Sequence, residues 1–278
     1  ALDHDGNQKW QRDFGTWTSQ HGFAASPMVY DDKVIVFNSQ QSDRLKPGQK
    51  SGGSHVIAVD RETGADAWSS SLTSTRACYA IPSIFKDKNG TEQLVSCNTG
   101  DGFFSLDPKT GKQNWATLPF RMRTVASTLT VDGLIIGSNG SGGGGNYLVA
   151  IRPGNGINSV PEKVYEIKKA NYVPTPIAVD GKLYLFSDKG IGKCVELQTG
   201  DPIWEERIAK GFSGSPIATT SNIYIMDEVG NLLVIGTGSE YEQICKHFLG
   251  ESTRATPAVA GNRLYLRTDS HLICVGEK

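Results

Sequence analysis

The chain has 278 residues, of which 38% are hydrophobic and 21% are charged, and its formal net charge is −1 at pH 7. With a sequence pI near 6.6, it lacks the broad basic surface with which nucleic-acid-binding proteins release counterions, so we expect no nucleic-acid partner. No stretch approaches the ~18 apolar residues of a membrane-spanning helix, so we expect no transmembrane segment.

Six phrases recur along the chain, each with a small residue and usually a proline before a β-branched run. Their anchors are Pro27, Pro82, Thr128, Pro176, Pro216 and Pro257. Each anchor is followed by a short strand, a tight turn such as Asn89-Gly90 or Asp132-Gly133, and a second strand. Asn-Gly and Asp-Gly pairs between alternating strands predict a hairpin, because glycine adopts a positive φ without a steric penalty.

A second phrase closes three of these units with an acidic residue, a Thr-Gly turn and a tryptophan four residues after the glycine. Its copies read AVDRETGADAW at 58–68, SLDPKTGKQNW at 105–115 and CVELQTGDPIW at 194–204, and a shortened copy ends on Trp10. Each unit is therefore a predicted four-stranded antiparallel meander. Repeats of this kind predict a β-propeller, with the tryptophans packed between neighbouring blades.

We thus predict an all-β fold, with a single β-propeller domain over residues 1–278 and six recognised blades of four antiparallel strands. The last unit ends after a third strand at 272–275. Residues 6–14 would supply its fourth strand, so that pairing of the N- and C-terminal strands closes the ring and removes an open edge. Residues 1–3 resemble the end of another third strand, so the sequence is also compatible with a native ring of seven or eight blades.

The five cysteines are an odd number without CxxC spacing, and three of them (Cys97, Cys194 and Cys274) fall on apolar strand positions. We interpret them as small buried hydrophobic residues. Cys78 and Cys97 lie on neighbouring strands of one unit and are the only pair worth testing for a disulfide. Cysteine usage therefore does not decide the compartment.

The pattern A-x-D-x-x-T-G-x-x-x-W, preceded by an SP-x-V strand, resembles the pyrroloquinoline-quinone (PQQ) repeat of quinoprotein-like propellers over almost the whole chain. The resemblance implies one of two functions. One branch of that family contains alcohol and aldose dehydrogenases that hold PQQ and Ca²⁺ on the propeller axis. The other contains non-catalytic propellers, similar to the lipoprotein of the outer-membrane β-barrel assembly machinery, which bind partner proteins.

Signals for catalysis or metal binding are missing from the sequence. The dehydrogenase branch carries adjacent cysteines over its cofactor, whereas no two cysteines are adjacent here. The five histidines show neither HxH nor HExxH spacing, and no GxSxG occurs. We therefore expect no enzyme, no cofactor and no metal site.

Cations and aromatic residues gather three to six positions before the proline or threonine anchors, where loops enter the innermost strands. We predict that they surround one mouth of the propeller and bind a protein partner or an acidic peptide, because arginine and aromatic side chains dominate binding hot spots. The residues are Phe23, Arg76, Tyr79, Arg123, Tyr172, Lys210, Phe212 and Arg254. The competing interpretation is that they plug the channel and pair with carboxylates of adjacent loops.

The sequence thus favours a non-enzymatic, monomeric scaffold for protein interactions in the bacterial cell envelope, in the periplasm or another extracytoplasmic location. The alternative is a propeller that binds PQQ or another anionic cofactor.

Overall fold

The computed structural model describes residues 1–117, 120–154 and 156–276. Within these ranges the regular structure consists of 23 β-strands, which confirms the predicted all-β fold. In the described part of the chain, no helix is long and apolar enough to cross a membrane.

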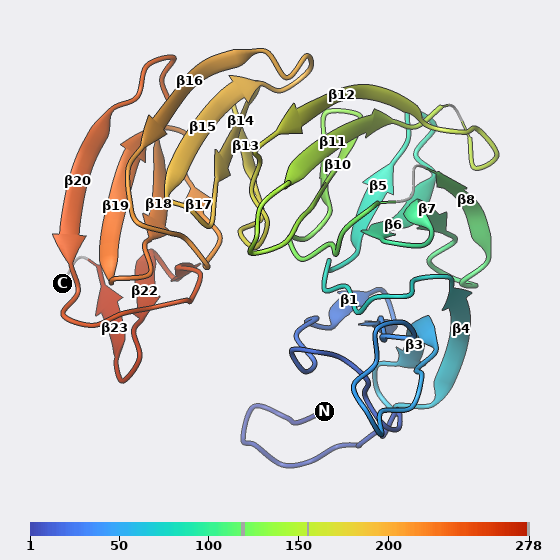
Figure 1. The fold of residues 1–278 in the computed structure, drawn as a ribbon. Helices are drawn as coiled ribbons and strands as arrows, with labels where there is room; N and C mark the ends of the chain where they lie inside the picture. Colours follow the sequence, from blue (N-terminus) through green and yellow to red (C-terminus); the bar gives the residue numbers. More distant parts are fainter. Residues whose placement is uncertain (118–119, 155, 277–278) are drawn as a thin grey trace. The chain divides into compact units, whose positions relative to one another are not determined.

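The strands form successive antiparallel sheets, five with four strands and a last one with three, and each sheet follows the order of the sequence (Figure 1). The first blade consists of β1 Met28–Tyr30, β2 Lys33–Asn38, β3 Ser54–Asp60 and β4 Asp66–Leu72. The second consists of β5 Ser83–Lys86, β6 Glu92–Asn98, β7 Gly102–Leu106 and β8 Gln113–Thr117. The third consists of β9 Leu129–Val131, β10 Leu134–Asn139, β11 Tyr147–Arg152 and β12 Glu162–Lys168.

The remaining strands repeat this meander three more times. The fourth blade consists of β13 Ile177–Val179, β14 Lys182–Phe186, β15 Ile191–Glu196 and β16 Pro202–Arg207. The fifth consists of β17 Ile217–Ala218, β18 Asn222–Met226, β19 Asn231–Gly236 and β20 Gln243–Phe248. The last sheet consists of β21 Ala258–Ala260, β22 Arg263–Arg267 and β23 Leu272–Val275. The six predicted blades are therefore confirmed.

The hairpins form where the sequence predicts them, and their backbone explains the residues. At the turn between β9 and β10, Asp132 and Gly133 have φ values of 45° and 78°. At the turn between β13 and β14, Asp180 and Gly181 have φ values of 48° and 71°. Two successive positive φ values match the right-handed twist of the flanking strands, and Asp and Gly are among the few residues that tolerate them.

The Thr-Gly turns are held by the acidic residue that precedes them. In the first blade the Asp60 carboxylate accepts hydrogen bonds from the backbone N–H and the hydroxyl of Thr63, both at 2.7 Å. These bonds lower the pKa of Asp60, with the Thr63 hydroxyl contributing most. The Gly64 N–H then donates to the Asp60 carbonyl at 2.9 Å, and Gly64 has a φ of 72°. A positive φ at this position explains the glycine.

Each of three Thr-Gly turns is covered by an aromatic ring from an earlier part of the chain. The Trp10 indole donates to the Arg61 carbonyl at 2.9 Å, and the Trp68 indole donates to the Pro108 carbonyl at 3.2 Å. In the same way, the Tyr165 hydroxyl donates to the Leu197 carbonyl at 2.9 Å. In every case the accepting carbonyl lies three residues before the turn glycine. A Cβ on Gly64 or on Gly200 would lie 2.7 Å from the covering ring, so these rings require glycine beneath them.

Trp10 thus occupies on the first blade the place that Trp68 of β4 occupies on the second. Trp68 lies on the fourth strand of its blade, which supports the interpretation of residues 6–14 as a fourth strand. In the described part of the chain, the pairing of this segment is limited to one bridge between Leu2 and Gln8. Ring closure through residues 6–14 and β23 therefore stays a prediction.

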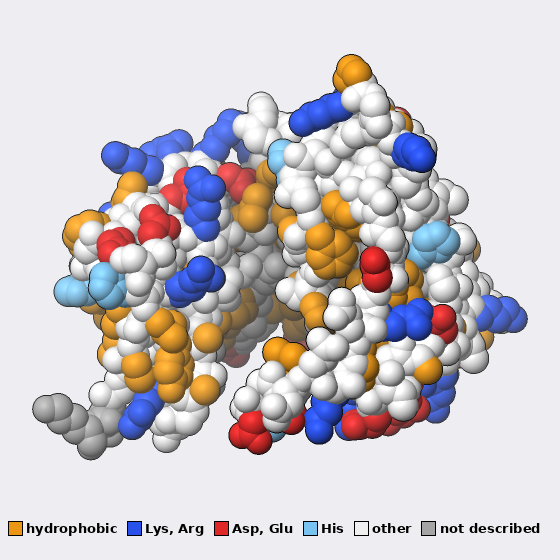
Figure 2. All heavy atoms as spheres, turned by 90° about the horizontal axis from the view of Figure 1, so that it is seen from below, with side chains coloured by type: hydrophobic (Ala, Val, Ile, Leu, Met, Phe, Trp, Pro, Cys, Tyr) orange, Lys and Arg blue, Asp and Glu red, His pale blue; other side chains and the backbone are white. Residues whose placement is uncertain are grey.

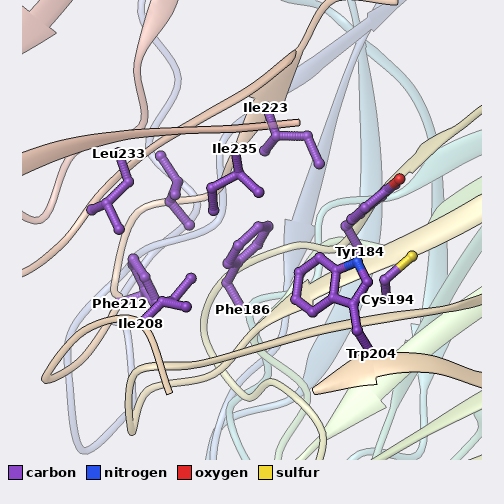
Figure 3. Close-up of a cluster of buried hydrophobic side chains, with 10 residues drawn as sticks. Tyr184, Phe186, Cys194, Trp204, Ile208, Phe212, Ile223, Leu233 and Ile235 are labelled. Carbon is purple, nitrogen blue, oxygen red and sulfur yellow. The ribbon is translucent and has the colours of Figure 1, made fainter. Parts of the chain in front are cut away.

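The chain divides into two compact units, Ala1–Gly137 with Ile151–Glu162, and Ser138–Ala150 with Lys163–Lys278. The boundary runs through the third blade. The core of the first unit lies between the first two blades, where Phe37 and Phe104 stack with ring centroids 6.3 Å apart. The core of the second unit lies between the fourth and fifth blades and includes Tyr184, Trp204 and Phe212 (Figure 3).

The cysteines follow the prediction in part. Cys78, Cys97 and Cys194 are free and buried, and burial raises the pKa of Cys97 to about 12. Cys245 and Cys274 are free and exposed, contrary to the expectation for the strand position of Cys274. Cys274 is exposed because, among the described residues, β23 pairs with β22 on one side and has no strand on the other.

Candidate functional site

In the first unit, the irregular segment before β1 connects the predicted binding residues of different blades. The Ser19 and Tyr79 hydroxyls are 2.7 Å apart, so this segment touches the loop that enters the second blade. The Arg123 guanidinium donates to the Gln20 side-chain oxygen at 3.0 Å and to the Ala77 carbonyl at 2.8 Å. The structure therefore brings Arg123 and Tyr79 together, with Arg76 adjacent to Ala77 in the same loop.

An exposed aromatic pair lies on the same segment. Phe23 packs edge-on against Trp17 with ring centroids 4.8 Å apart, and Phe23 keeps 50% of its surface exposed. The indole nitrogen of Trp17 is buried and has no hydrogen-bond partner among the described residues. Aromatic rings that offer large contact area at low entropic cost are typical of binding surfaces.

In the second unit, the four predicted residues differ in exposure. Lys210 and Arg254 are exposed and Tyr172 is half-buried. Phe212 has 0% exposure and packs edge-on against Phe186 with ring centroids 5.5 Å apart, inside the core of Figure 3. The expectation that Phe212 faces a partner is therefore corrected: its side chain belongs to the core.

Tyr79 needs a similar correction, since only 6% of its surface is exposed and its hydroxyl is hydrogen-bonded to Ser19. Its ring supports the segment that carries Phe23 and is not itself available for contact. Aligning the repeats on their proline anchors selects the loop that carries Tyr79. It does not tell which side chains of that loop point outward.

Loop carboxylates lie close to the predicted cations but are already hydrogen-bonded. Asp101 accepts from the Thr73 backbone N–H at 2.9 Å and from the Thr73 hydroxyl at 2.8 Å. Asp188 accepts from the Val173 N–H at 3.0 Å and the Tyr172 N–H at 3.1 Å. These two carboxylates therefore fix the loops that enter the second and fourth blades.

Two of the loop carboxyl groups have shifted pKa values with opposite signs. Burial raises the pKa of Asp188 above its ordinary 3.8, against the lowering effect of the backbone N–H groups. Glu251 in the last entry loop is half-buried, and hydrogen bonds from Ser270 lower its pKa to about 2. Glu251 also accepts from the Thr268 hydroxyl at 2.8 Å.

The predicted cations, in contrast, have no acidic partner. Among the described residues, the side chains of Arg76, Lys210 and Arg254 form neither an ion pair nor a hydrogen bond, and Arg123 donates only to uncharged oxygens. The interpretation that these side chains pair with adjacent carboxylates therefore does not describe the structure. Each unit keeps uncompensated positive charge at its entry loops, which attracts anionic groups.

The described residues contain no group of three or more His, Cys, Asp or Glu side chains that could hold a metal ion. Asp101, the sequence position closest to a calcium-ligand candidate, instead accepts hydrogen bonds from Thr73 and from the Asn98 amide at 2.8 Å. This geometry is that of a turn-stabilising carboxylate.

Sequence reasoning missed two contributors to these surfaces, Trp17 and Gln20. Trp17 lies outside the repeated phrase, and an aromatic residue in an irregular segment near Phe23 was the available signal. Gln20 carries no local signal, because its role depends on the loop that it meets.

Comparison with known proteins identifies the family of the chain. The family model described as "Outer membrane protein assembly factor BamB" matches residues 1–241. The chain belongs to this PQQ-like family. No curated protein sequence matches it.

Three solved structures are similar to the chain at low identity, and the two with a TM-score above 0.5 show the same fold. BamB from Moraxella catarrhalis is 17% identical, with 87% of this chain and 82% of that one covered and a TM-score of 0.45. The computationally designed Ika8 protein is 10% identical, with 87% and 66% covered and a TM-score of 0.64. The quinohemoprotein alcohol dehydrogenase ADHIIG from Pseudomonas putida HK5 is 13% identical, with a TM-score of 0.59. The matched region covers 83% of this chain but only 42% of the dehydrogenase, so the likeness shows the fold alone.

Proposed function

We propose that this PQQ-like propeller is a non-enzymatic scaffold that binds an acidic segment of a protein partner in the bacterial cell envelope. The family match supports this proposal, because the family is described as an assembly factor of the outer membrane. The same match supports a periplasmic or other extracytoplasmic location. The proposed scaffold acts as a monomer.

The proposal rests on a difference between the acidic and the basic side chains of the entry loops. Carboxylates such as Asp101 and Asp188 accept hydrogen bonds from the loops, whereas Arg76, Lys210 and Arg254 remain unpaired. A cation without a partner is available for a ligand without first breaking an internal ion pair. Such a surface accelerates association with an acidic segment and selects against basic partners.

The first unit offers the most complete contact surface. Arg76 and Arg123 supply charge, and the exposed Phe23 beside Trp17 supplies apolar area. This combination fits an acidic segment that also carries an apolar side chain, because arginine and aromatic residues contribute most of the energy in protein interfaces.

Charge reversal on the full chain tests the proposal. Arg76→Glu should abolish co-purification of the envelope partner captured by the unmodified protein after cross-linking in cells. The matched control is Lys109→Glu, which makes the same charge change on an exposed residue of the second Thr-Gly turn. Equal capture by both variants would contradict the proposed surface.

Titration with PQQ and Ca²⁺ separates the scaffold from the cofactor-binding alternative. A scaffold shows no saturable change in absorbance and no rise in Tm. Saturable PQQ binding with a thermal shift would instead favour the quinone-binding function, because a ligand that binds only the folded state raises stability.

A further inference from the structure

We infer that a cavity at the entry loop of the last sheet is a subsite for a carboxylate, such as an acidic side chain of a protein partner. This inference rests on the proposed function and locates one of its contacts. The cavity has a volume of about 260 Å³. It is lined by Thr253, Arg254, Ala255, Arg267, Thr268 and Asp269, all within the second unit.

The walls of the cavity are fixed by hydrogen bonds that join the entry loop to the end of β22 and to the turn after it. The Thr253 hydroxyl donates to the Arg267 carbonyl at 2.6 Å, and the Ala255 N–H donates to the Thr253 hydroxyl at 3.1 Å. The Asp269 N–H donates to the Ser252 carbonyl at 3.0 Å. Thr253 of the entry loop and Thr268 of the turn are each only 3% exposed, so both walls are anchored in the interior.

The acidic and basic side chains at the cavity differ in whether they have hydrogen-bond partners. Asp269 accepts a hydrogen bond from the Ser252 hydroxyl, and the nearby Glu251 carboxylate is bonded by Thr268, Ser270 and His271. Within the described ranges, the guanidinium groups of Arg254 and Arg267 form no ion pair and no hydrogen bond. The lining therefore contains the carboxylate of Asp269 and two guanidinium groups without an ion-pair partner among the described residues, and the Glu251 carboxylate lies beside it on Thr268.

The two arginines of the lining suit a carboxylate ligand. Guanidinium groups bind planar carboxylates through two parallel hydrogen bonds, which gives geometric specificity as well as attraction. An acidic segment of the proposed protein partner would supply this group as a side-chain carboxylate.

The size of the cavity points to a side chain and not to a whole cofactor. Pockets that enclose a drug-sized ligand span roughly 300–1,000 Å³. At about 260 Å³, this cavity is smaller than that range. It suits one acidic side chain, presented by a segment whose remaining contacts lie outside the cavity.

Binding of a fluorescently labelled peptide of four glutamates, acetylated and amidated at its ends, tests the subsite on the full chain. Arg254→Ala and Arg267→Ala should each raise its Kd about tenfold or more, as expected when one partner of a charge pair is removed. The matched control is Arg263→Ala, an exposed arginine of the same strand β22 that does not line the cavity. This control should change the Kd by less than about twofold.

Three further measurements keep the test decisive. Arg267→Lys should recover only part of the affinity, because lysine retains the charge but loses the planar fork. A peptide of four glutamines should not bind, because it has the same length but no carboxylate side chain. An unchanged Tm for each variant shows that the sheet has folded.

Equal weakening by Arg263→Ala, or equal binding of the glutamine peptide, would overturn the carboxylate subsite. The outcomes also separate this inference from the proposed function. If Arg76→Glu abolishes partner capture but Arg267→Ala leaves peptide binding intact, only the subsite is wrong. If the cavity binds the peptide but Arg76→Glu leaves partner capture unchanged, the proposed scaffold surface is wrong and the subsite stands.

Discussion

The fourth blade and the last sheet belong to the same unit and open with the same phrase, yet they differ in burial. In the fourth blade Cys194 pairs with Tyr184 on one side and with Trp204 on the other, and Cys194 and Tyr184 have 0% exposure. In the last sheet Cys274 pairs only with Tyr265, and Cys274 is exposed.

The last sheet exposes apolar side chains that a complete blade would cover. Val259 is 65% exposed and Leu272 is 70% exposed. In Figure 2 hydrophobic side chains gather on the left side of the view, where the last sheet lies. The comparison teaches that the repeated phrases specify strands and register, whereas burial depends on a fourth strand with its aromatic ring.

The largest expected effect is the loss of Trp204 from the complete blade. Trp204→Ala should destabilise the protein by about 3–5 kcal/mol, because it removes a large buried side chain and leaves a cavity. The ring is 9% exposed and lies 5.3 Å from the Tyr241 ring and 6.1 Å from the Tyr184 ring. Denaturant unfolding followed by fluorescence measures the change. A loss of unfolding free energy below about 1 kcal/mol would contradict the conclusion that burial depends on the aromatic residue of the fourth strand.

The two turn glycines Gly200 and Gly261 provide the next test. Gly200→Ala should cost about 2–4 kcal/mol, because alanine is strained at a φ of 74° and its Cβ would overlap the Tyr165 ring. Gly261→Ala in the last sheet should cost about 1–2 kcal/mol, since its φ of 53° is also positive but nothing lies within 4 Å of the added Cβ. The difference in unfolding free energy isolates the contribution of the covering ring.

A smaller effect is expected on the open sheet itself. Leu272→Ser should change stability by no more than about 0.5 kcal/mol, because exposed surface substitutions rarely cost more. Thermal unfolding of the full chain measures this. A loss above about 1.5 kcal/mol would mean that Leu272 is covered in solution, which a closing strand would explain.

The smallest expected effect is a pH dependence with opposite signs in the two regions. Glu251 has a lowered pKa of about 2, against an ordinary value of 4.5, so its stabilising contribution is present above pH 4.5 and is lost as pH falls toward 2. Asp188 has a raised pKa, so its contribution is present below 3.8 and is lost as pH rises through its folded pKa. Carboxyl carbon NMR titration of both residues checks the two directions. A Glu251 midpoint near 4.5 would contradict the hydrogen-bonded geometry.

Much of the fold follows from the sequence because its signals are local. Asp132-Gly133 and Asp180-Gly181 specify their turns through backbone conformation alone, and Asp60 caps a turn three residues away. The packing role of Trp68 is also predictable, because the Thr-Gly turn that its ring covers repeats in the chain.

The candidate site is less predictable, because its residues depend on contacts between distant loops. Phe212 and Lys210 lie in the same entry loop, yet one is a core residue and the other is exposed. No local pattern distinguishes them. The contact of Gln20 with Arg123 spans 103 residues, and the cavity around Arg267 forms only when the last entry loop meets the end of β22.

The aromatic rings on the Thr-Gly turns have a consequence for the evolution of the chain. Each ring meets a main-chain carbonyl and a turn glycine, and neither of these two contacts depends on a side chain of the neighbouring unit. A duplicated or deleted unit would meet its new neighbour through the same two backbone features. Gene duplication could thus lengthen or shorten such an array without requiring compensating substitutions at the joint.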